Sequence, residues 1–235
     1  MDATRYLRET PLLDYSSKSI QSLIERRHWR ELDEFNRIKY IYDFVRDEIL
    51  FGYNISDRIP ASRVLSDGYG QCNTKGTLFM ALLRAVGIPC RVHGFTIDKK
   101  LQKGAMTGIV YRNAPNNIFH SWVELYFEGQ WYELEGFILD KHYLRSLQTK
   151  YRNCTGTFCG YGVAVRDFHH PVIDWNRNNT YIQSEGINQD FGVYNSPDEL
   201  LKEHGQQLSG LRELLYRHLG RHLMNRNVKQ MRKIR

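Results

Sequence analysis

The strongest local signal in this chain is Gly68-Tyr69-Gly70-Gln71-Cys72 together with the apolar residues that follow it. Two glycines interrupt the chain, and from Cys72 to Val86 the apolar residues recur at the spacing of a helix. Gly87 then stands where a helix ends, and Pro89 prevents its continuation. The sequence therefore predicts a helix over residues 72–86 whose first residue is a cysteine.

A cysteine at the start of a helix lies beside unpaired backbone N–H groups and the positive end of the helix dipole. Both favour the thiolate form of Cys72, which is the nucleophilic form, and the same amides suit an oxyanion that develops beside it. Ordinary packing of a small apolar side chain is the competing interpretation. Cys72 is thus a candidate nucleophile whose partners must come from elsewhere in the chain.

The segment before this helix also has helical periodicity. Apolar residues recur at i, i+3 and i+4 within residues 20–24 and again from Leu32 to Ile49. A loop marked by Gly and Pro follows, with one further helical turn predicted at residues 61–65. We therefore expect a helical N-terminal part over residues 14–86.

The segment after the helix has the alternation of β-strands. Three strands are predicted, the last two joined by a hairpin turn at Glu128-Gly129-Gln130: Cys90–Ile97, Phe119–Phe127 and Trp131–Glu135. Residues 98–117 are predicted as a long loop of the kind that flanks sites, and residues 151–195 have no period that predicts an element. With a sheet part over residues 88–195, helices followed by an antiparallel sheet make the fold class α+β.

Two residues of the predicted sheet are candidate partners for Cys72. His120 lies on the second strand, and Glu135 lies at the end of the third, at a similar offset from the hairpin turn. Adjacent strands would therefore bring the two side chains near one another. A carboxylate there would fix the tautomer of the imidazole and stabilise the imidazolium of a Cys–His pair. Taken singly, His120 also fits a core histidine and Glu135 a charge at a strand edge.

Three blocks of sequence occur in a fixed order along the chain. They are Tyr69-Gly70-Gln71-Cys72 with Leu82-Leu83-Arg84-x-x-Gly87-Ile88-Pro89-x-Arg91-Val92, then Phe119-His120-x-Trp122-Val123-Glu124, then Trp131-x-x-Leu134-Glu135. Together they resemble the catalytic core of the transglutaminase-like superfamily. The resemblance implies a single-domain, bacterial-type member with a papain-like core. It also implies Cys72 as the nucleophile, His120 as the general base and acid, and Glu135 as the orienting acid.

The chain departs from the pattern of this family at three positions. Glu135 stands where family members usually have Asp, which adds one methylene and keeps the charge. Asn73 stands directly after the cysteine, where animal transglutaminases have Trp. Their upstream Trp, believed to help stabilise the oxyanion, falls nearest to Arg58. The Cys72 amide is therefore the first candidate oxyanion donor, and the second is unidentified.

Active members of the superfamily share one half-reaction, in which a thiolate attacks an amide or ester carbonyl and forms a thioester. The resemblance thus implies a cysteine protease, amidase or acyltransferase acting on a peptide, a protein or a small amide. Gln71 and Asn73, which flank the nucleophile, and Trp122 are the candidate substrate-binding residues. No cofactor is implied, and no calcium loop of the EF-hand type is visible. A catalytically silent transglutaminase-like binding module is the alternative, favoured by Glu135 and the missing upstream Trp.

Two other groups of residues invite a functional interpretation. Cys154, Cys159 and the pair His169-His170 are zinc-ligand types, but their spacing matches no common zinc pattern, so no metal site is predicted. Three lysines in the long loop either keep it solvated or attract an acidic substrate: Lys99, Lys100 and Lys103.

The net charge of +7 belongs to the end of the chain. Residues 212–235 hold eight Lys and Arg against one Glu, whereas residues 1–211 hold 25 basic and 25 acidic side chains. We expect one domain over residues 1–211 and a C-terminal helix with a basic tail over residues 196–235. Four leucines are predicted to dock this helix on the domain: Leu211, Leu215, Leu219 and Leu223.

The basic tail is a candidate contact for an acidic partner, and a membrane surface or a nucleic acid are alternatives. Nucleic acid is disfavoured because the aromatic residues of a stacking platform are missing after Tyr216. A hydrophobic content of 41% excludes general disorder. No apolar stretch approaches the roughly 20 residues of a membrane span, and the polar start of the chain lacks a signal-peptide core. With four cysteines that fit reduced thiols, the expected location is the cytoplasm.

Overall fold

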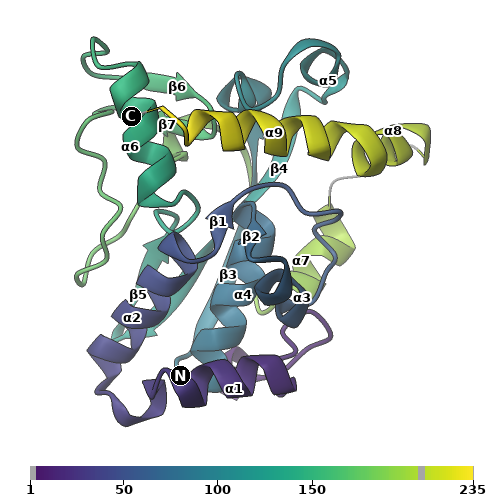
Figure 1. The fold of residues 1–235 in the computed structure, drawn as a ribbon. Helices are drawn as coiled ribbons and strands as arrows, with labels where there is room; N and C mark the ends of the chain where they lie inside the picture. Colours follow the sequence, from purple (N-terminus) through teal and green to yellow (C-terminus); the bar gives the residue numbers. More distant parts are fainter. Residues whose placement is uncertain (1–3, 206–209, 235) are drawn as a thin grey trace.

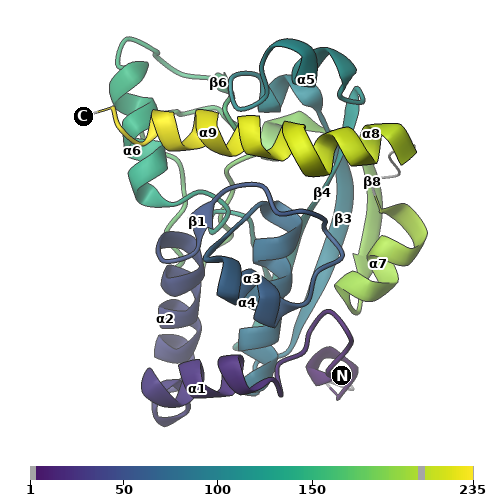
Figure 2. The ribbon, with the colours of Figure 1, turned by 45° about the vertical axis from the view of Figure 1, so that its right-hand side comes forward.

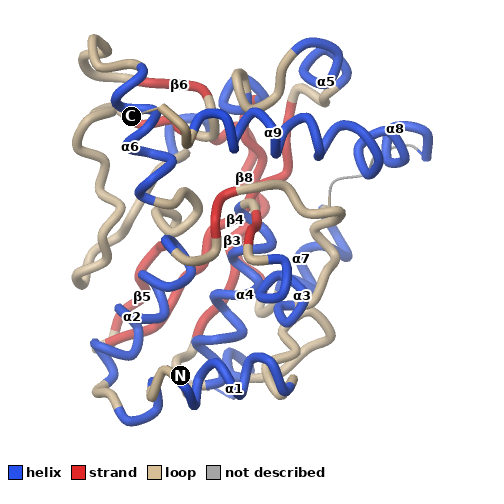
Figure 3. The backbone as a smooth tube through the Cα atoms, viewed as in Figure 1, coloured by secondary structure: helices blue, strands red, loops and turns tan. Residues whose placement is uncertain are grey.

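Helix α4 (Cys72–Ala85) lies at the centre of the molecule, against a four-stranded antiparallel sheet (Figures 1 and 3). The computed structural model describes residues 4–205 and 210–234. Residues 78–83 of α4 are completely buried, because the helix is apolar on all sides and is enclosed between the sheet and the N-terminal helices. The helix begins at the predicted cysteine and ends one residue before the predicted end.

The strands of the main sheet stand in the order β5-β4-β3-β8. The strands are β1 (Leu50–Phe51), β2 (Tyr69–Gly70), β3 (Cys90–Asp98), β4 (Asn117–Phe127), β5 (Gln130–Leu134), β6 (Phe158–Gly160), β7 (Val163–Val165) and β8 (Ile187–Tyr194). The hairpin between β4 and β5 turns at Glu128 and Gly129, both with positive φ, as a tight turn between antiparallel strands requires. The predicted hairpin is confirmed.

The helices that precede the sheet are those expected from the N-terminal periodicity, so the α+β class is confirmed. The α-helices are α1 (Lys18–Arg26), α2 (Glu34–Asp47), α3 (Ala61–Asp67), α4, α5 (Gly108–Asn113), α6 (Lys141–Lys150), α7 (Pro197–His204), α8 (Gly210–Leu215) and α9 (Arg221–Met231). Shorter helical turns are η1 (Thr4–Leu7), η2 (Trp29–Glu31), η3 (Lys99–Gln102), η4 (Ser184–Gly186) and the π-helical turn η5 (Tyr216–Gly220). Among the described residues, no helix is both long and apolar enough to cross a membrane.

Two segments hold more structure than their sequences predict. The expected loop over residues 98–117 contains η3 and α5, and residues 151–195 contain a β6–β7 hairpin and β8. Strand β8 pairs with β3 at the edge of the main sheet, where most of its side chains are exposed. An edge strand with little burial has no alternation of apolar and polar residues, which is why its sequence gives no strand signal.

The C-terminal helices lie across one end of the molecule, with α9 running from α8 toward α6 (Figures 1 and 2). The predicted leucine stripe is wrong as a docking face, because Leu215 and Leu219 are about half exposed. The buried residues of this segment are instead Gly220, Met224, Val228 and Met231. A four-residue spacing drifts around a helix with 3.6 residues per turn, and the π-helical turn shifts it further. The side chains of Leu211 and Arg212, and all of Arg235, lie outside the described residues.

Part of the basic tail is tied into the fold. The Asn225 side chain accepts a hydrogen bond from the Tyr53 N–H at 2.7 Å and donates to the Tyr53 carbonyl at 3.0 Å. Arg232 forms an ion pair with the buried Asp140 and donates to the carbonyl of Phe51. Other basic side chains of the C-terminal segment are exposed: Arg226, Lys229 and Lys233. Their contact with an acidic partner, like the division at residues 1–211 and 196–235, stays a prediction.

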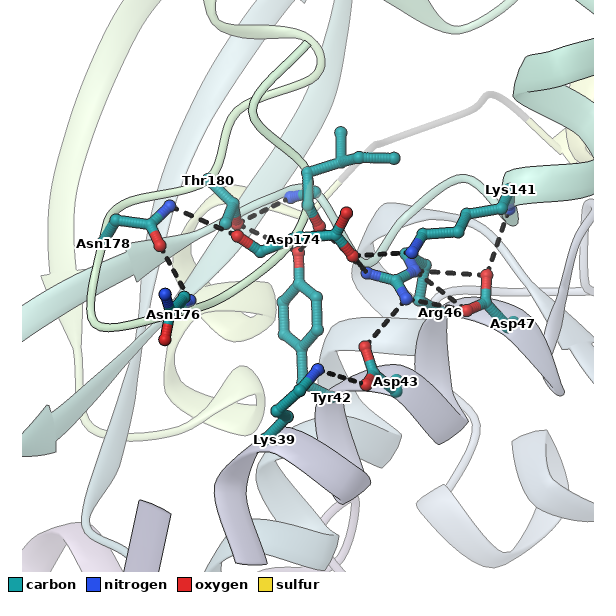
Figure 4. Close-up of polar contacts among 12 residues, drawn as sticks. Lys39, Tyr42, Asp43, Arg46, Asp47, Lys141, Asp174, Asn176, Asn178 and Thr180 are labelled. Atoms are coloured by element: carbon teal, nitrogen blue, oxygen red, sulfur yellow. Dashed lines mark hydrogen bonds and ion pairs between the residues drawn. The ribbon is translucent and has the colours of Figure 1, made fainter. Parts of the chain in front are cut away.

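A polar network joins α2 to the loop at residues 173–180 (Figure 4). Arg46, only 2% exposed, forms ion pairs at 2.8 Å with Asp43, Asp47 and Asp174. The hydroxyl of Tyr42 donates to the carbonyl of Ile173 at 2.7 Å and contacts the Thr180 hydroxyl at 3.1 Å. The network therefore fixes this loop beside β5. Glu135 is the residue that directly follows β5 in the chain.

We predict that Arg46→Met lowers the free energy of unfolding by about 1–3 kcal/mol, because it removes a buried guanidinium and its charge-assisted hydrogen bonds, although Lys39 and Lys141 still pair with Asp43 and Asp174. Urea denaturation followed by circular dichroism measures the change. The matched control is Arg63→Met, which removes a more exposed ion pair with Asp67 and should leave the stability nearly unchanged. Equal losses in the two variants would contradict this account of the network.

Candidate active site

Cys72 is held at the first position of α4 by the chain that precedes it. The Gln71 N–H donates to Thr74 Oγ1 at 3.1 Å, and the Thr74 hydroxyl donates to Asn54 Oδ1 at 2.6 Å. A Cβ on Gly70 would lie 2.7 Å from Thr74 Oγ1, so only glycine allows this approach. Strand β2 also pairs with β1, which anchors the turn on its other side. The thiol therefore sits at the N-terminus of the helix, as predicted.

His120 lies on β4 with its ring completely buried. Its Nε2 is 2.8 Å from Glu135 Oε1, so the predicted partners are in direct contact. The ring also packs edge-on against Phe95 of β3, with 4.8 Å between the ring centroids. The imidazole is thus fixed both by a hydrogen bond and by packing.

Glu135 follows β5 and is also completely buried. Its Oε2 accepts hydrogen bonds of 2.8 Å from the N–H groups of Ile182 and Gln183. Its own N–H donates to the carbonyl of Thr180 at 2.9 Å, in the loop that the Arg46 network holds. Each carboxylate oxygen has a partner, which a buried carboxylate requires. The longer side chain of Glu, compared with Asp, is accommodated in this arrangement.

The electrostatics of His120 depend on its two neighbours. Burial of the ring lowers its pKa, but attraction to Cys72 and hydrogen bonding with Glu135 outweigh the burial and raise the pKa to about 10. Nε2 is occupied by Glu135, and Nδ1 has no hydrogen-bond partner of ordinary geometry among the described residues. Nδ1 is therefore the nitrogen left for the thiol.

A cavity of about 1070 Å³ opens beside Cys72. Its lining is mostly apolar and comes chiefly from residues 51–59, the start of α4, the segment from η3 to β4 and the C-terminal helices. Ile138 and Gln183 also line it. Large cavities with an apolar lining and a few polar groups are typical of substrate sites. Tyr216 of the C-terminal segment lines it and donates to the Asn54 carbonyl at 2.9 Å.

The predicted substrate-binding residues differ in their positions. Gln71 and Asn73 line the cavity, although Asn73 is 7% exposed and its Oδ1 accepts from the Ser121 hydroxyl at 2.9 Å. Trp122 is not part of the cavity lining. Its ring packs against Phe95 of β3 and against Tyr181. The alternation of residues along β4 does not predict these contacts.

Sequence reasoning missed other residues of the cavity. Asp57 lies in the loop next to Arg58, and Gln183 lies in the segment whose sequence has no period. Asn54 and Thr74 fix the turn before the nucleophile. An Asp in a loop rich in polar residues carries no signal by itself. The contact of Gln183 with Glu135 joins residues far apart in the sequence, which periodicity cannot detect.

Other candidate groups take no part in this site. The buried Lys75 donates to the carbonyls of Arg46 and Ile138, and burial lowers its pKa to about 7. Within residues 4–205 and 210–234, no three His, Cys, Asp or Glu side chains are close enough together to hold a metal ion. Cys154 and Cys159 are therefore not part of such a group. His170 instead contacts Asp167 on the surface.

The comparisons with known proteins agree with the blocks of sequence. Residues 23–136 match the model of the Transglutaminase-like superfamily. Over 62 residues, 26% of this chain, the sequence is 40% identical to Uncharacterized protein YebA of Bacillus subtilis (strain 168), and the match spans 8% of that protein. The match confirms the resemblance to the transglutaminase-like superfamily over residues 23–136.

Two solved structures are also similar to this chain. One is a "putative cysteine protease" from Cytophaga hutchinsonii, with 14% identity and a TM-score of 0.43 over 84% of this chain and 48% of that one. The other is red sea bream transglutaminase, with 18% identity and a TM-score of 0.32 over 57% of this chain and 25% of that one. The chain spans less than half the length of either protein.

We predict that the imidazole of His120 stays cationic through neutral pH and loses its proton only near pH 10, because its pKa is raised to about 10. Nitrogen chemical shifts of the histidine rings, followed by NMR across the pH range, measure this titration. Cys72→Ala and Glu135→Gln should each lower the midpoint, since each removes a negative charge beside the ring. A midpoint near the ordinary value of about 6.5 in the unmodified protein would contradict the arrangement.

Proposed function

We propose that this chain is a thiol enzyme that cleaves or transfers acyl groups of an amide or peptide-type substrate through a thioester on Cys72. The observation that carries the proposal is the buried His120–Glu135 pair, joined at 2.8 Å beside a cysteine at the N-terminus of a helix. A histidine oriented by a carboxylate and adjacent to a nucleophile is the arrangement that acyl transfer needs.

The first half-reaction forms the thioester. The Cys72 thiolate attacks the carbonyl carbon of the substrate, and the negative charge moves to the carbonyl oxygen. The N–H groups in the first turn of α4 have no intrahelical partners and can stabilise this charge. The imidazolium of His120 then gives its proton to the departing nitrogen as the C–N bond breaks.

The second half-reaction releases the acyl group. His120, now neutral, accepts a proton from water or an amine that attacks the thioester. The C–S bond breaks, and Cys72 and the imidazolium are restored. Glu135 stabilises the cation at both stages without taking the proton. Water as the acceptor gives hydrolysis, and an amine gives acyl transfer.

The substrate of this enzyme is a peptide, a protein or a small amide. The cavity beside Cys72 is large enough for a side chain and the adjoining backbone, and its apolar lining suits an apolar segment next to the scissile bond. Cys72, Cys90, Cys154 and Cys159 are all free, which suits a reducing compartment, and we place the enzyme in the cytoplasm.

We predict that Cys72→Ala abolishes the burst of p-nitrophenolate from p-nitrophenyl acetate, because no thioester can form. His120→Ala should slow acylation at pH 7 by about 10–30-fold, because without the imidazolium Cys72 is mostly a protonated thiol with a pKa of about 8.5. Stopped-flow absorbance measures the burst, and intact-protein mass spectrometry locates the acetyl group.

The control is Cys159→Ala, because this exposed cysteine lies outside the cavity lining and should leave the burst unchanged. Adding an amine to the acetylated enzyme and comparing amide with acetate as the product decides between transfer and hydrolysis. A folded Cys72→Ala protein with an undiminished burst would remove the proposal. A protein that forms no acyl adduct at Cys72 would instead be a silent binding module.

A further inference from the structure

The charges of this protein are separated along the chain in a way that the net charge does not show. Residues 99–116, 141–166 and 214–234 contain no Asp or Glu, so all 26 acidic residues lie elsewhere. The same three segments hold four, five and six Lys and Arg residues. The rest of the chain holds 18 basic side chains against 26 acidic ones, so it is net negative.

The three segments lie together at one end of the molecule, which carries α5, α6 and α9 in both views of the ribbon (Figures 1 and 2). The Asn227 side chain of α9 donates to the carbonyl of Ala105 at 3.0 Å. The Ser146 hydroxyl of α6 donates to the carbonyl of Ile234 at 3.1 Å. The C-terminal segment therefore joins the other two, and we call residues 99–116, 141–166 and 214–234 the basic end.

The basic end has cations that the protein itself does not neutralise. Some of its cations pair with carboxylates of other segments, as Lys141 does with Asp174 at 2.7 Å and Arg217 with Glu213 at 2.6 Å. Exposed Lys and Arg side chains that form no ion pair with any described residue occur on all three segments: Arg112, Arg145, Arg152, Arg226, Lys229 and Lys233. These charges are available to an anion outside the molecule.

Exposed apolar side chains lie at the same end. Leu214 and Leu215 of α8 and Leu219 of η5 are each about half exposed, and Ile109 of α5 is 61% exposed. Ile109, Leu215 and Leu219 also line the cavity beside Cys72, so they mark its mouth. Leucines next to Lys and Arg on the exposed side of a helix are typical of segments that lie at a membrane–water interface.

We propose that the basic end docks on an anionic lipid membrane, with Leu214, Leu215 and Leu219 entering the boundary between headgroups and acyl chains. The exposed Lys and Arg side chains contact the headgroups, and the net-negative remainder of the chain is repelled from them, which fixes the orientation. The mouth of the cavity then faces the membrane. This docking does not depend on the chemistry of Cys72, so it goes beyond the proposed function.

Two other polyanions fit the charge of the basic end less well. A nucleic acid would bind the cations, but it offers no apolar partner to exposed leucines. An acidic peptide in the cavity would meet Arg58 and Arg217, which are the cations among its described lining residues, and Arg217 is already paired with Glu213. The exposed cations of α6 and α9 would then have no role. A membrane surface uses both the cations and the leucines.

Flotation of the full chain with lipid vesicles tests the docking. One set of vesicles is pure phosphatidylcholine, and the other contains about 30% phosphatidylserine, an anionic lipid of the cytoplasmic leaflet. We expect the protein to float with the anionic vesicles at least about 100-fold more strongly than with the neutral ones, because each Lys or Arg near the surface contributes about fivefold. High salt should weaken this binding, because it screens the charges.

The charge variant is Arg226→Gln/Lys229→Gln/Lys233→Gln, which should lower binding to anionic vesicles about 100-fold, at about fivefold for each charge. The matched control is Lys18→Gln/Arg26→Gln/Arg30→Gln. It removes three equally exposed cations in and beside α1, at the opposite end of the molecule (Figure 1), and should bind as the unmodified protein does.

The apolar variant is Leu214→Ser/Leu219→Ser. It should lower binding to anionic vesicles roughly tenfold, because two half-exposed leucines no longer enter the lipid. The matched control is Val172→Ser/Val193→Ser, which changes two exposed apolar side chains outside the basic end and should leave binding unchanged. All four variants alter exposed side chains, and circular dichroism checks that each is folded.

Several results would overturn the proposal. They are equal binding to the two kinds of vesicle, no binding to either, and equal losses in a variant and its control. Binding of polyglutamate or of RNA as tight as that of anionic vesicles at the same salt, with no effect of the leucine change, would make the basic end a site for polyanions other than a membrane. The acylation of Cys72 is measured without lipid, so its failure and the failure of docking are distinguishable.

Discussion

The hydrogen bond between His120 and Glu135 is the interaction on which the rest of the site depends. Both side chains are completely excluded from water, so an unpaired carboxylate or imidazolium would be costly there. The fold supplies what the pair needs. Two backbone N–H groups hold the far oxygen of Glu135, and the loop that provides them is tied to α2 by Arg46 and Tyr42. The reactivity proposed for Cys72 therefore rests on contacts spread over most of the chain.

The helix of the nucleophile and the β4–β5 hairpin could be predicted because their signals are local. A cysteine after a glycine turn, a helix end at Gly87 and a tight turn at Gly129 each reflect backbone conformations that only a few residues adopt. The hairpin then brings His120 of β4 near Glu135, the residue that follows β5, without information from the rest of the chain. The short blocks that resemble a known superfamily come from these same local constraints.

The parts that escaped prediction depend on contacts between distant segments. Strand β8 has half-exposed and exposed residues because it lies at an edge, and its pairing with β3 leaves no period in the sequence. The leucine stripe from Leu211 to Leu223 suggested a docking face, but Met224, Val228 and Met231 are the buried side chains. Gln183 reaches the site because the segment at residues 180–183 packs beside the end of β5 and binds Glu135. The net charge of the basic tail also gave no sign that Arg232 forms an ion pair with Asp140 inside the fold.

Competitive alkylation by iodoacetamide tests whether His120 and Glu135 make Cys72 a reactive thiolate. At about pH 6, where an ordinary thiol with a pKa of about 8.5 is almost entirely protonated, labelling is followed by peptide mass spectrometry. We expect Cys72 to be labelled well before the more exposed Cys159, and His120→Ala to remove this advantage. Labelling of Cys159 first, or a rate at Cys72 that is indifferent to His120→Ala, would contradict this expectation.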